Sequence, residues 1–228
     1  MGVAYNSGSI VTQNLVLCLD AGNRKSYPGS GTAWTDLSGR GNTGTLTSMD
    51  GTNFNSANGG SLTFNGSDDF VQCSGSLTLT AATFMVWIRR NGTQDLSDGI
   101  LFSRGTNVTG INFSSITNNQ LGYHWNAAPN TYSWASGLTI PNLEWSMCVV
   151  SVTSTAATAY LYQSSGLTTA VNTVDHSIAT MDDIKIGQDD FGGRFINGNI
   201  AQALIYNRAL TATEIRQNYL ATKSRYFS

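Results

Sequence analysis

The stretch that decides the fold reads Ile200-Ala-Gln-Ala-Leu-Ile-Tyr-Asn-Arg-Ala-Leu-Thr-Ala-Thr-Glu-Ile215. Its first part, 200–206, is apolar apart from one glutamine, which is typical of a buried strand. Thr211 and Glu214 then form a capping box, in which each side chain can accept a hydrogen bond from the other residue's backbone N–H. Leu210 and Ile215 occupy the two positions of a hydrophobic staple around that cap. We therefore predict a strand followed by a helix that ends near residue 222 and covers or plugs an end of the fold.

The composition of the whole chain favours strands and turns. The 228 residues include 27 Thr, 25 Ser, 24 Gly and 21 Asn, whereas Glu occurs only at Glu144 and Glu214, and Lys occurs three times. Glu and Lys are the common residues of exposed helix surfaces, so a mostly helical protein is excluded. Thr, Ser, Asn and Gly are the residues of strands and tight turns. With a hydrophobic fraction of 40%, the chain can build a sizeable core, and we expect an all-β protein.

Short strand candidates recur with turn signals between them, a spacing typical of a sandwich or barrel. Within 83–89, Phe84, Val86 and Ile88 face one way and Met85 and Trp87 the other, which predicts a strand covered on both faces. No internal repeat or long hydrophilic linker divides the chain, so we predict an N-terminal arm over 1–14 and one domain over 15–228. The predicted strands are Leu15–Asp20, Ser61–Asn65, Phe70–Cys73, Thr83–Arg89, Gly99–Ser103, Gly110–Ser114, Gln120–Trp125, Thr131–Trp134, Trp145–Val152, Ala157–Gln163, Asp183–Gly187 and Ile200–Tyr206.

Charge and cysteine usage exclude several classes of protein. The net charge is −2 and the pI about 5.5, whereas nucleic acids and anionic membranes require a basic footprint. The longest apolar run, Leu15–Leu19, is far shorter than the roughly 20 residues of a membrane span, and no signal peptide opens the chain. Cys18, Cys73 and Cys148 lie far apart in the sequence, so we expect buried free thiols and synthesis in a reducing compartment.

Four segments stand in a characteristic order along the chain. They are the Asp36-Leu-Ser-Gly-Arg-Gly-Asn-Thr-Gly44 turn, the Leu62-Thr-Phe-Asn-Gly-Ser-Asp-Asp-Phe-Val71 hairpin, the strand Phe84–Ile88 and the closing stretch 200–215. Together they resemble the concanavalin A-like, laminin-G-like jelly-roll domains over about residues 15–222. The resemblance implies a two-sheet antiparallel jelly-roll sandwich with one short C-terminal helix. That family includes lectins, adhesion modules, glycoside hydrolases and structural modules, so the fold leaves the function open.

Three segments resemble a subgroup common among tailed-phage virion proteins: Leu19-Asp-Ala-Gly-Asn23, Ser26-Tyr-Pro-Gly-Ser-Gly31 and Asn218-Tyr-Leu-Ala-Thr-Lys223. This resemblance implies a non-catalytic protein of the virion surface, such as a capsid decoration, present in many copies or as a homo-oligomer and contacting other capsid or tail proteins. The polar first residues would suit an arm that docks on a neighbouring subunit. The alternative is a lectin-like tail or fibre module that binds host surface carbohydrate, and a glycoside hydrolase is the third possibility.

The family resemblance also implies a calcium ion between the early strand, the D-x-S-G turn and the closing strand. Its candidate ligands here are Asp20, Asp36 and Asn42, together with backbone carbonyls. Ala201 stands where the family often has Asp, which removes one carboxylate. Capping of Asx turns is the commoner use of such side chains.

Sequence patterns of catalysis are missing from the chain. The stretch Gly39-Arg-Gly-Asn-Thr-Gly44 matches G-x-G-x-x-G but runs into a β-like segment rather than a helix, so its glycines indicate turns. The E-x-D-x-x-E motif of glucanases with this fold does not occur, and the pairs Asp68-Asp69, Asp182-Asp183 and Asp189-Asp190 sit in turn-like contexts. We therefore expect no enzyme activity.

An aromatic cluster is the best candidate for ligand recognition. Tyr123, Trp125, Tyr132 and Trp134 lie close together in the sequence, and aromatic faces stack on sugar rings. Polar neighbours for hydrogen bonds to a glycan would be Asn126, Asn130 and Asp98. The same rings could instead fill the core of the sandwich or a subunit contact.

Overall fold

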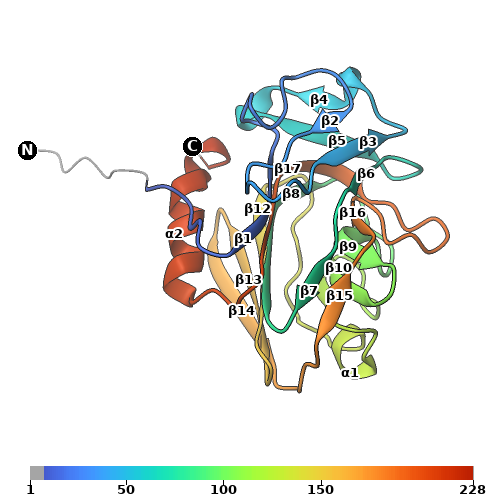
Figure 1. Cartoon of the computed structure of the whole chain (residues 1–228), viewed down its shortest axis with the longest axis vertical. Coiled ribbons are helices and arrows are strands. Elements are labelled where there is room, and N and C mark those ends of the chain that lie inside the picture. Colours follow the sequence, from blue (N-terminus) through green and yellow to red (C-terminus); the bar gives the residue numbers. More distant parts are fainter. Residues whose placement is uncertain (1–7, 228) are drawn as a thin grey trace, which may run out of the picture.

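The closing strand of the sequence motif, β17 (Asn197–Tyr206), runs through the middle of a large antiparallel sheet, sheet A. The computed structural model describes residues 8–227, and Figure 1 shows this sheet beside the C-terminal helix. β17 pairs on one side with β8 and on the other with β5 and then β1, within the order β14-β13-β12-β8-β17-β5-β4. The other strands of sheet A are β1 (Leu15–Asp20), β4 (Phe54–Asn55), β5 (Ser61–Asn65), β8 (Ala82–Arg90), β12 (Ser146–Val152), β13 (Ala157–Gln163) and β14 (Gly166–Asn172).

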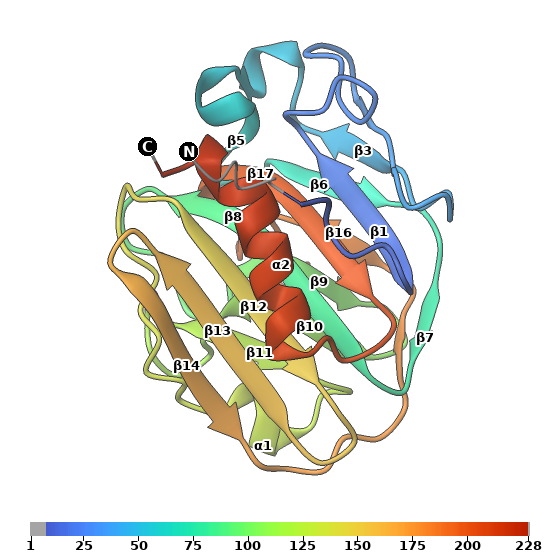
Figure 2. The ribbon, with the colours of Figure 1, turned by 90° about the vertical axis from the view of Figure 1, so that its left-hand side faces the viewer.

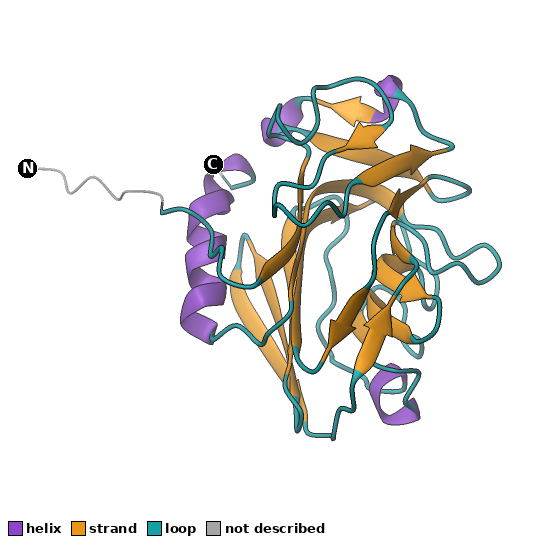
Figure 3. Ribbon diagram, viewed as in Figure 1, coloured by secondary structure: helices purple, strands orange, loops and turns teal. Residues whose placement is uncertain are grey.

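A second antiparallel sheet, sheet B, stacks against sheet A across the core (Figures 1 and 3). Its strand order is β11-β10-β9-β16-β6-β3-β2, and a separate pair, β7 (Leu77–Leu79) with β15 (Ala179–Met181), lies beside it. The two-sheet jelly-roll sandwich expected from the sequence is therefore confirmed. The strands of sheet B are β2 (Ala33–Trp34), β3 (Gly44–Thr47), β6 (Phe70–Cys73), β9 (Gly99–Arg104), β10 (Val108–Phe113), β11 (Leu121–His124) and β16 (Ile184–Ile186).

Strand β8 shows how alternation builds two apolar layers. Phe84, Val86 and Ile88 point into the core between the sheets, where they are almost completely buried. Met85 and Trp87 point to the other face of sheet A and join a second apolar cluster. Both faces are thus covered, as the alternating apolar sequence predicts.

The helix α2 (Ala212–Thr222) covers this second cluster, as Figure 2 shows in front of sheet A. Its predicted cap is present, because the Thr211 side chain accepts from the Glu214 N–H and the Glu214 side chain accepts from the Thr211 N–H. Ile215 is completely buried against the sheet. A short 3₁₀ turn (Lys223–Arg225) extends the helix, and similar turns occur at Gly51–Asn53 and Ala57–Gly59.

The described part of the predicted N-terminal arm, residues 8–14, lies against its own domain. The Val11 N–H donates to Asn218 Oδ1 at 2.7 Å, and the Tyr206 hydroxyl donates to the Val11 carbonyl at 2.8 Å. The side chains of Ile10 and Val11 pack against the cluster under α2. This part of the arm is therefore held by its own helix rather than extended toward a neighbour, and residues 1–7 of the predicted arm lie outside the described residues.

One predicted strand is wrong. Residues 131–134 belong to a short helix, α1 (Pro129–Tyr132), and the turn after it. Pro129 fixes the backbone at the start of this helix, and the Thr131 hydroxyl donates to the Ala128 carbonyl at 2.7 Å, which closes the turn. No strand was predicted at the short strands β2, β4, β7 and β15 or at the edge strand β14, and β3 was described only as a β-like segment.

The three cysteines are buried free thiols, as predicted. Burial raises the pKa of Cys18 and of Cys73 to about 12, and it raises the pKa of the Cys148 thiol as well. None of the helices between residues 8 and 227 has both the length and the hydropathy of a membrane span.

Candidate functional site

The residues predicted to bind calcium are engaged in hydrogen bonds that hold a turn. Asp36 Oδ1 accepts from the backbone N–H groups of Cys18 and Ser38, both at 2.9 Å. Its Oδ2 accepts from Ser38 Oγ at 2.7 Å and from the Asn42 N–H at 3.0 Å. Asn42 in turn donates its amide to the Val16 carbonyl at 2.6 Å. Asp36 and Asn42 therefore fasten the turn after β2 to strand β1.

Asp20, the third candidate ligand, is paired with an arginine. Arg225 Nη1 and Nη2 donate to Asp20 Oδ2 and Oδ1, each at 2.9 Å, and the Gln202 amide donates to Oδ2 at 3.2 Å. Among the residues that the structure describes, no three His, Cys, Asp or Glu side chains gather as a metal site. The residues present therefore do not fit a calcium ion, and the positive charge beside Asp20 is the guanidinium of Arg225.

Two members of the predicted aromatic cluster are core residues. Tyr123 and Trp125 are each 1% exposed, and their rings pack between the sheets. The Tyr123 hydroxyl lies 3.0 Å from His176 Nε2, and Trp125 Nε1 donates to the Ser177 carbonyl at 2.6 Å. Neither ring is available to stack on a sugar, because strand alternation turns both toward the core, the alternative that the sequence left open.

The other two predicted aromatic residues are half-buried. Trp134 packs edge-on against Tyr123, with ring centroids 5.7 Å apart, and so supports the core from its rim. Tyr132, in α1, stacks on His124 with ring centroids 5.3 Å apart and lines a pocket. Of the predicted polar neighbours, Asn126 donates to the Ser177 hydroxyl at 2.9 Å, and the Asn130 carbonyl accepts from Asn172. Tyr132 is thus the one predicted aromatic residue that lines this pocket.

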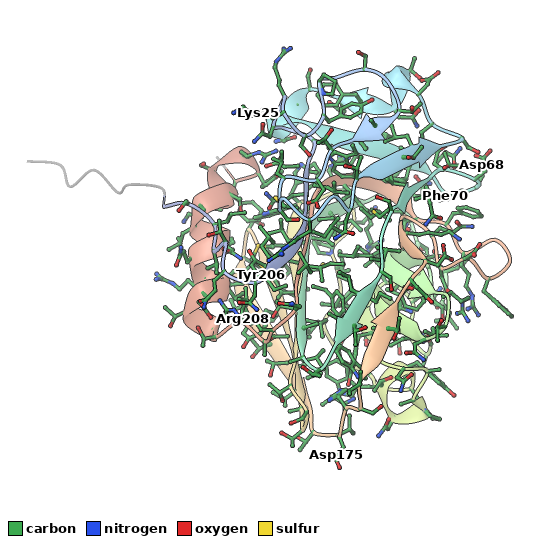
Figure 4. All side chains as sticks on the ribbon, in the orientation of Figure 1. Lys25, Asp68, Phe70, Asp175, Tyr206 and Arg208 are labelled. Atoms are coloured by element: carbon green, nitrogen blue, oxygen red, sulfur yellow. The ribbon has the colours of Figure 1, made fainter. Side chains whose placement is uncertain are left out.

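The pocket lies on the outer face of sheet B, away from α2, and has a volume of about 340 Å³. In Figure 4, Phe70 marks the sheet B side of the molecule and Tyr206 marks the side covered by α2. The walls come from the loop before β9, from α1 and from the loop between β16 and β17. Its polar and aromatic lining consists of Ser97, Arg104, Ser115, His124, Tyr132 and Arg194.

Paired strand positions form the floor of the pocket. Phe102 and His124 flank Gly110 across β9, β10 and β11, and the two rings meet edge to face with centroids 5.0 Å apart. His124 Nε2 lies 3.1 Å from Ser115 Oγ, which accepts from Ser97 Oγ at 2.8 Å. Burial, together with the nearby positive arginines, lowers the pKa of His124 to about 3, so the ring is neutral at physiological pH.

Two arginines form the wall beside the β16–β17 loop. Arg104 from β9 and Arg194 from the loop both donate to the carboxylate of Asp189, through Arg104 Nη2 at 3.0 Å and Arg194 Nη1 at 2.9 Å. The Asp189 side chain is fully buried. Phe191 at the loop tip is 58% exposed, and its ring centroid lies 5.1 Å from Arg104 Cζ and 4.6 Å from Arg194 Cζ. The buried carboxylate and the ring together fix both guanidinium groups.

Polar atoms without partners lie beneath the floor. Asn112 is 0% exposed, yet neither its amide nitrogen nor its oxygen has a hydrogen-bond partner, and the same holds for Asp98 Oδ1 and His124 Nδ1. Burial raises the pKa of Asp98 to about 7, against the opposing effect of a hydrogen bond from the Asp95 N–H. Similar buried polar atoms occur elsewhere in the described chain, at Trp34, Trp145 and Tyr226, so these atoms do not by themselves mark a site.

Sequence reasoning identified Tyr132 but missed Arg104, Arg194 and Phe191, and Asp98, predicted as a hydrogen-bonding neighbour of a glycan, is buried and does not line the pocket. These three residues come from two segments about 90 positions apart, which only the pairing of β9 with β16 brings together. A local signal was present in Phe191-Gly-Gly-Arg194, because two consecutive glycines indicate a turn and place Phe191 outside a strand. Both glycines have positive φ in the structure. The neighbouring pair Asp189-Asp190 lies in the loop between β16 and β17, and the Asp189 carboxylate also binds two arginines there, which its turn-like context did not indicate.

The comparisons with known proteins agree with this architecture. A profile for the concanavalin A-like lectin/glucanases superfamily, Laminin_G_3, matches residues 64–216, whereas no curated protein sequence gives a significant match. Domain 4 of AbnA, a GH43 extracellular arabinanase from Geobacillus stearothermophilus solved with arabinotriose, superposes with a TM-score of 0.65 at 16% identity over 91% of this chain and 98% of that one.

Two further structures share the fold over parts of longer chains. Trypanosoma rangeli sialidase in complex with the inhibitor DANA has a TM-score of 0.65 at 15% identity, covering 100% of this chain but 36% of the sialidase. The botulinum neurotoxin type G receptor binding domain has a TM-score of 0.54 at 16% identity, covering 90% of this chain and 51% of that one. The likeness at these identities is one of fold. With its family profile matched over most of its length, the chain belongs to the concanavalin A-like lectin/glucanases superfamily, in the Laminin_G_3 family.

Proposed function

We propose that this protein is a non-catalytic, lectin-like module that binds carbohydrate in the pocket on the outer face of sheet B. The observation that carries the proposal is the lining itself. The aromatic ring of Tyr132, charged N–H donors at Arg104 and Arg194, and serine hydroxyls surround a space of about 340 Å³, and the exposed ring of Phe191 lies against both arginines. Rings that stack on a sugar, combined with fixed hydrogen-bond donors, are the groups that sugar recognition requires.

The structural neighbours support a carbohydrate ligand. The arabinanase domain was solved with arabinotriose, the sialidase with sialic acid or inhibitors, and the toxin fragment is a receptor-binding domain. This chain covers 98% of the arabinanase domain, so the likeness extends over that whole domain. Because that neighbour is one domain of an arabinanase and was solved with arabinotriose, the match supports our proposal of a carbohydrate-binding module.

The carboxylates near the pocket support a role without catalysis. Glycoside hydrolysis needs two carboxyl groups on either side of the scissile bond. Asp189 is fully buried and bound to two arginines, and Asp98 lies beneath the floor rather than in the lining. We therefore expect glycan binding without turnover.

A glycan array probed with the purified protein tests this function. We expect selective binding that weakens strongly in Tyr132→Ala, which removes a ring of the lining, and in Phe191→Ala, which removes the ring against the two arginines. Leu167→Ala, on the exposed edge strand β14, is the matched control and should bind as the wild type does. Absence of binding to every glycan, or equal loss in the control, would refute the proposal.

We further propose that the module acts on the surface of a tailed-phage particle, in contact with other virion proteins. This setting rests on the motifs 19–23 and 218–223 and on the exposed edge of sheet A. Strand β14 carries no charged residue, and Leu167 and Val171 are exposed on it, which leaves an edge open to a protein partner.

Quantitative mass analysis and imaging of purified particles test this location on the virion. Many copies on the capsid would support decoration, a few copies on the tail would support host recognition, and absence from particles would overturn it.

A further inference from the structure

The lining of the pocket is rich in hydrogen-bond donors and poor in acceptors. Arg104 and Arg194 bring charged N–H groups, and no Asp or Glu side chain lines the pocket within residues 8–227. A neutral sugar presents hydroxyls that must donate as well as accept, and the side-chain acceptors of this lining are hydroxyl oxygens and one imidazole. A ligand richer in acceptors than a neutral sugar would match this lining better.

The arginines keep donors free for such a ligand. Arg104 uses Nε and Nη2 on Asp189, and Arg194 uses Nη1. Arg104 Nη1 and Arg194 Nε and Nη2 make no hydrogen bond in the described part of the chain. Because Asp189 and Phe191 already hold both groups in place, little side-chain entropy remains to be lost when a ligand binds.

The charge around the pocket is positive. Two guanidinium groups face one buried carboxylate, that of Asp189, which leaves one positive charge in excess at the wall as long as Asp98, whose pKa burial raises to about 7, is protonated. Asp183 and Asp190 are held by Lys185 and do not line the pocket. His124 is neutral in this environment and adds no charge of its own.

We propose that the pocket binds a sugar residue that carries a carboxylate, with Arg194 and Arg104 as the groups that hold the carboxylate. The inference rests on the proposed function, since it specifies the ligand of the same pocket. Arginine binds carboxylates through two parallel N–H···O bonds, which gives both affinity and orientation. The ring of the sugar would lie against Tyr132, and its hydroxyls against Ser97 and Ser115.

Matched pairs of ligands test the carboxylate directly. The protein is titrated with polygalacturonate and with its methyl-esterified form, and with a sialylated oligosaccharide and its asialo form. We expect binding to at least one acidic member and about tenfold or greater loss when the carboxylate is esterified or removed. Equal binding of acidic and neutral forms would overturn the carboxylate inference and leave the proposed function standing. Binding of none of these ligands or of any arrayed glycan would overturn both.

Variants assign the carboxylate to the pocket. The Arg194 side chain is 31% exposed, and Asp189 keeps its ion pair with Arg104 when Arg194 is changed. Arg194→Gln is therefore expected to fold. We expect Arg194→Gln to weaken binding of the acidic glycan about tenfold, and Arg194→Lys to weaken it less, because the charge is kept and the fork is lost. Arg40→Gln removes the same charge from an exposed loop and is the control, and thermal unfolding of each variant reports its fold. Unchanged binding by folded Arg194→Gln would overturn the assignment to this pocket.

Discussion

At the scale of single residues, Asp98 and His124 carry opposite pH effects on the same sheet face. The pKa of Asp98 is raised to about 7 by burial, so the folded state loses stability as pH rises from about 4, the value in an unfolded chain, to about 7. The pKa of His124 is lowered to about 3, so stability is lost as pH falls from about 6.5 to about 3. Between pH 4 and 6.5 the two effects oppose each other, and the stability of the wild type changes less than either group alone would dictate.

The variant Asp98→Asn separates these effects. Its amide oxygen can still accept from the Asp95 N–H, while the buried charge is gone. We expect its advantage over the wild type to be absent near pH 4 and to grow to about 1 kcal/mol by pH 8, since partial hydration screens the charge. Urea unfolding at pH 4.5, 6 and 8 measures this, with Glu144→Gln, which removes an exposed carboxylate far from Asp98 in the sequence, as the control. A constant difference across the three pH values would contradict the burial of a titrating carboxyl at this position.

Trp125 and Trp134 are close in sequence but differ in what they contribute to stability. Trp125→Ala removes a fully buried ring and its hydrogen bond to the Ser177 carbonyl, and we expect it to lower the free energy of unfolding by about 3–5 kcal/mol. Trp134→Ala should cost less, because its ring is half-buried at the rim of the core. Denaturant unfolding of both variants provides the measurement. A larger loss for Trp134 than for Trp125 would contradict this ranking.

At the scale of elements, α2 depends on the sheet beneath it as much as on its own sequence. Trp87 donates its Nε1 to Thr222 Oγ1 at 2.9 Å and stacks on Tyr226 with centroids 4.1 Å apart. Asn218 links the helix to Tyr206 on β17 and to the backbone of Val11. The helix therefore joins the two ends of the chain to the outer face of sheet A.

The N-cap of α2 provides the prediction at this scale. Thr211→Ala removes an acceptor for the Glu214 N–H, and we expect it to lower the free energy of unfolding by about 1 kcal/mol. Thr213→Ala, two residues on and exposed within the helix, is the matched control and should be neutral or slightly stabilising, because Ala has the higher helix propensity. Denaturant titrations compare the two. Equal effects of both changes would show that the cap contributes nothing.

The sequence predicts those elements whose signals are local. The cap of α2 and the alternation of β8 each reside in a short segment, and the structure confirms both. The strand predicted over 131–134 was wrong because aromatic composition favoured β while Pro129 started a helix. The pocket could not be predicted as a unit, because Arg104, Tyr132 and Arg194 meet only through strand pairing and loop placement.

At the scale of the whole molecule, the two sheets have different surroundings. The central strands of sheet A are covered on one face by sheet B and on the other by α2, as Figure 2 shows. No helix like α2 covers the outer face of sheet B in the described chain, where loops and the short α1 surround the pocket instead. The apolar cluster between sheet A and α2 therefore contributes to stability, whereas the outer face of sheet B is open to a ligand.

Arg225 links the end of the described chain to the sandwich at Asp20, one of the residues where the family resemblance implies a calcium ion. Arg225, beyond α2, binds both carboxylate oxygens of Asp20 at 2.9 Å, and Asp36 is saturated by four donors, so no carboxylate at this place is free to bind an ion. We expect the melting temperature to be the same, within error, in EDTA and in millimolar calcium, because an ion that does not bind the native state cannot stabilise it. Arg225→Ala should lower the free energy of unfolding by about 1–3 kcal/mol, since it leaves a part-buried carboxylate without its charged partner, while Arg40→Ala should have little effect. Thermal unfolding of the three proteins with and without calcium measures both effects. A rise in the wild-type melting temperature with calcium would show that the metal binds the native state, and would contradict the prediction that these carboxylates are fully engaged.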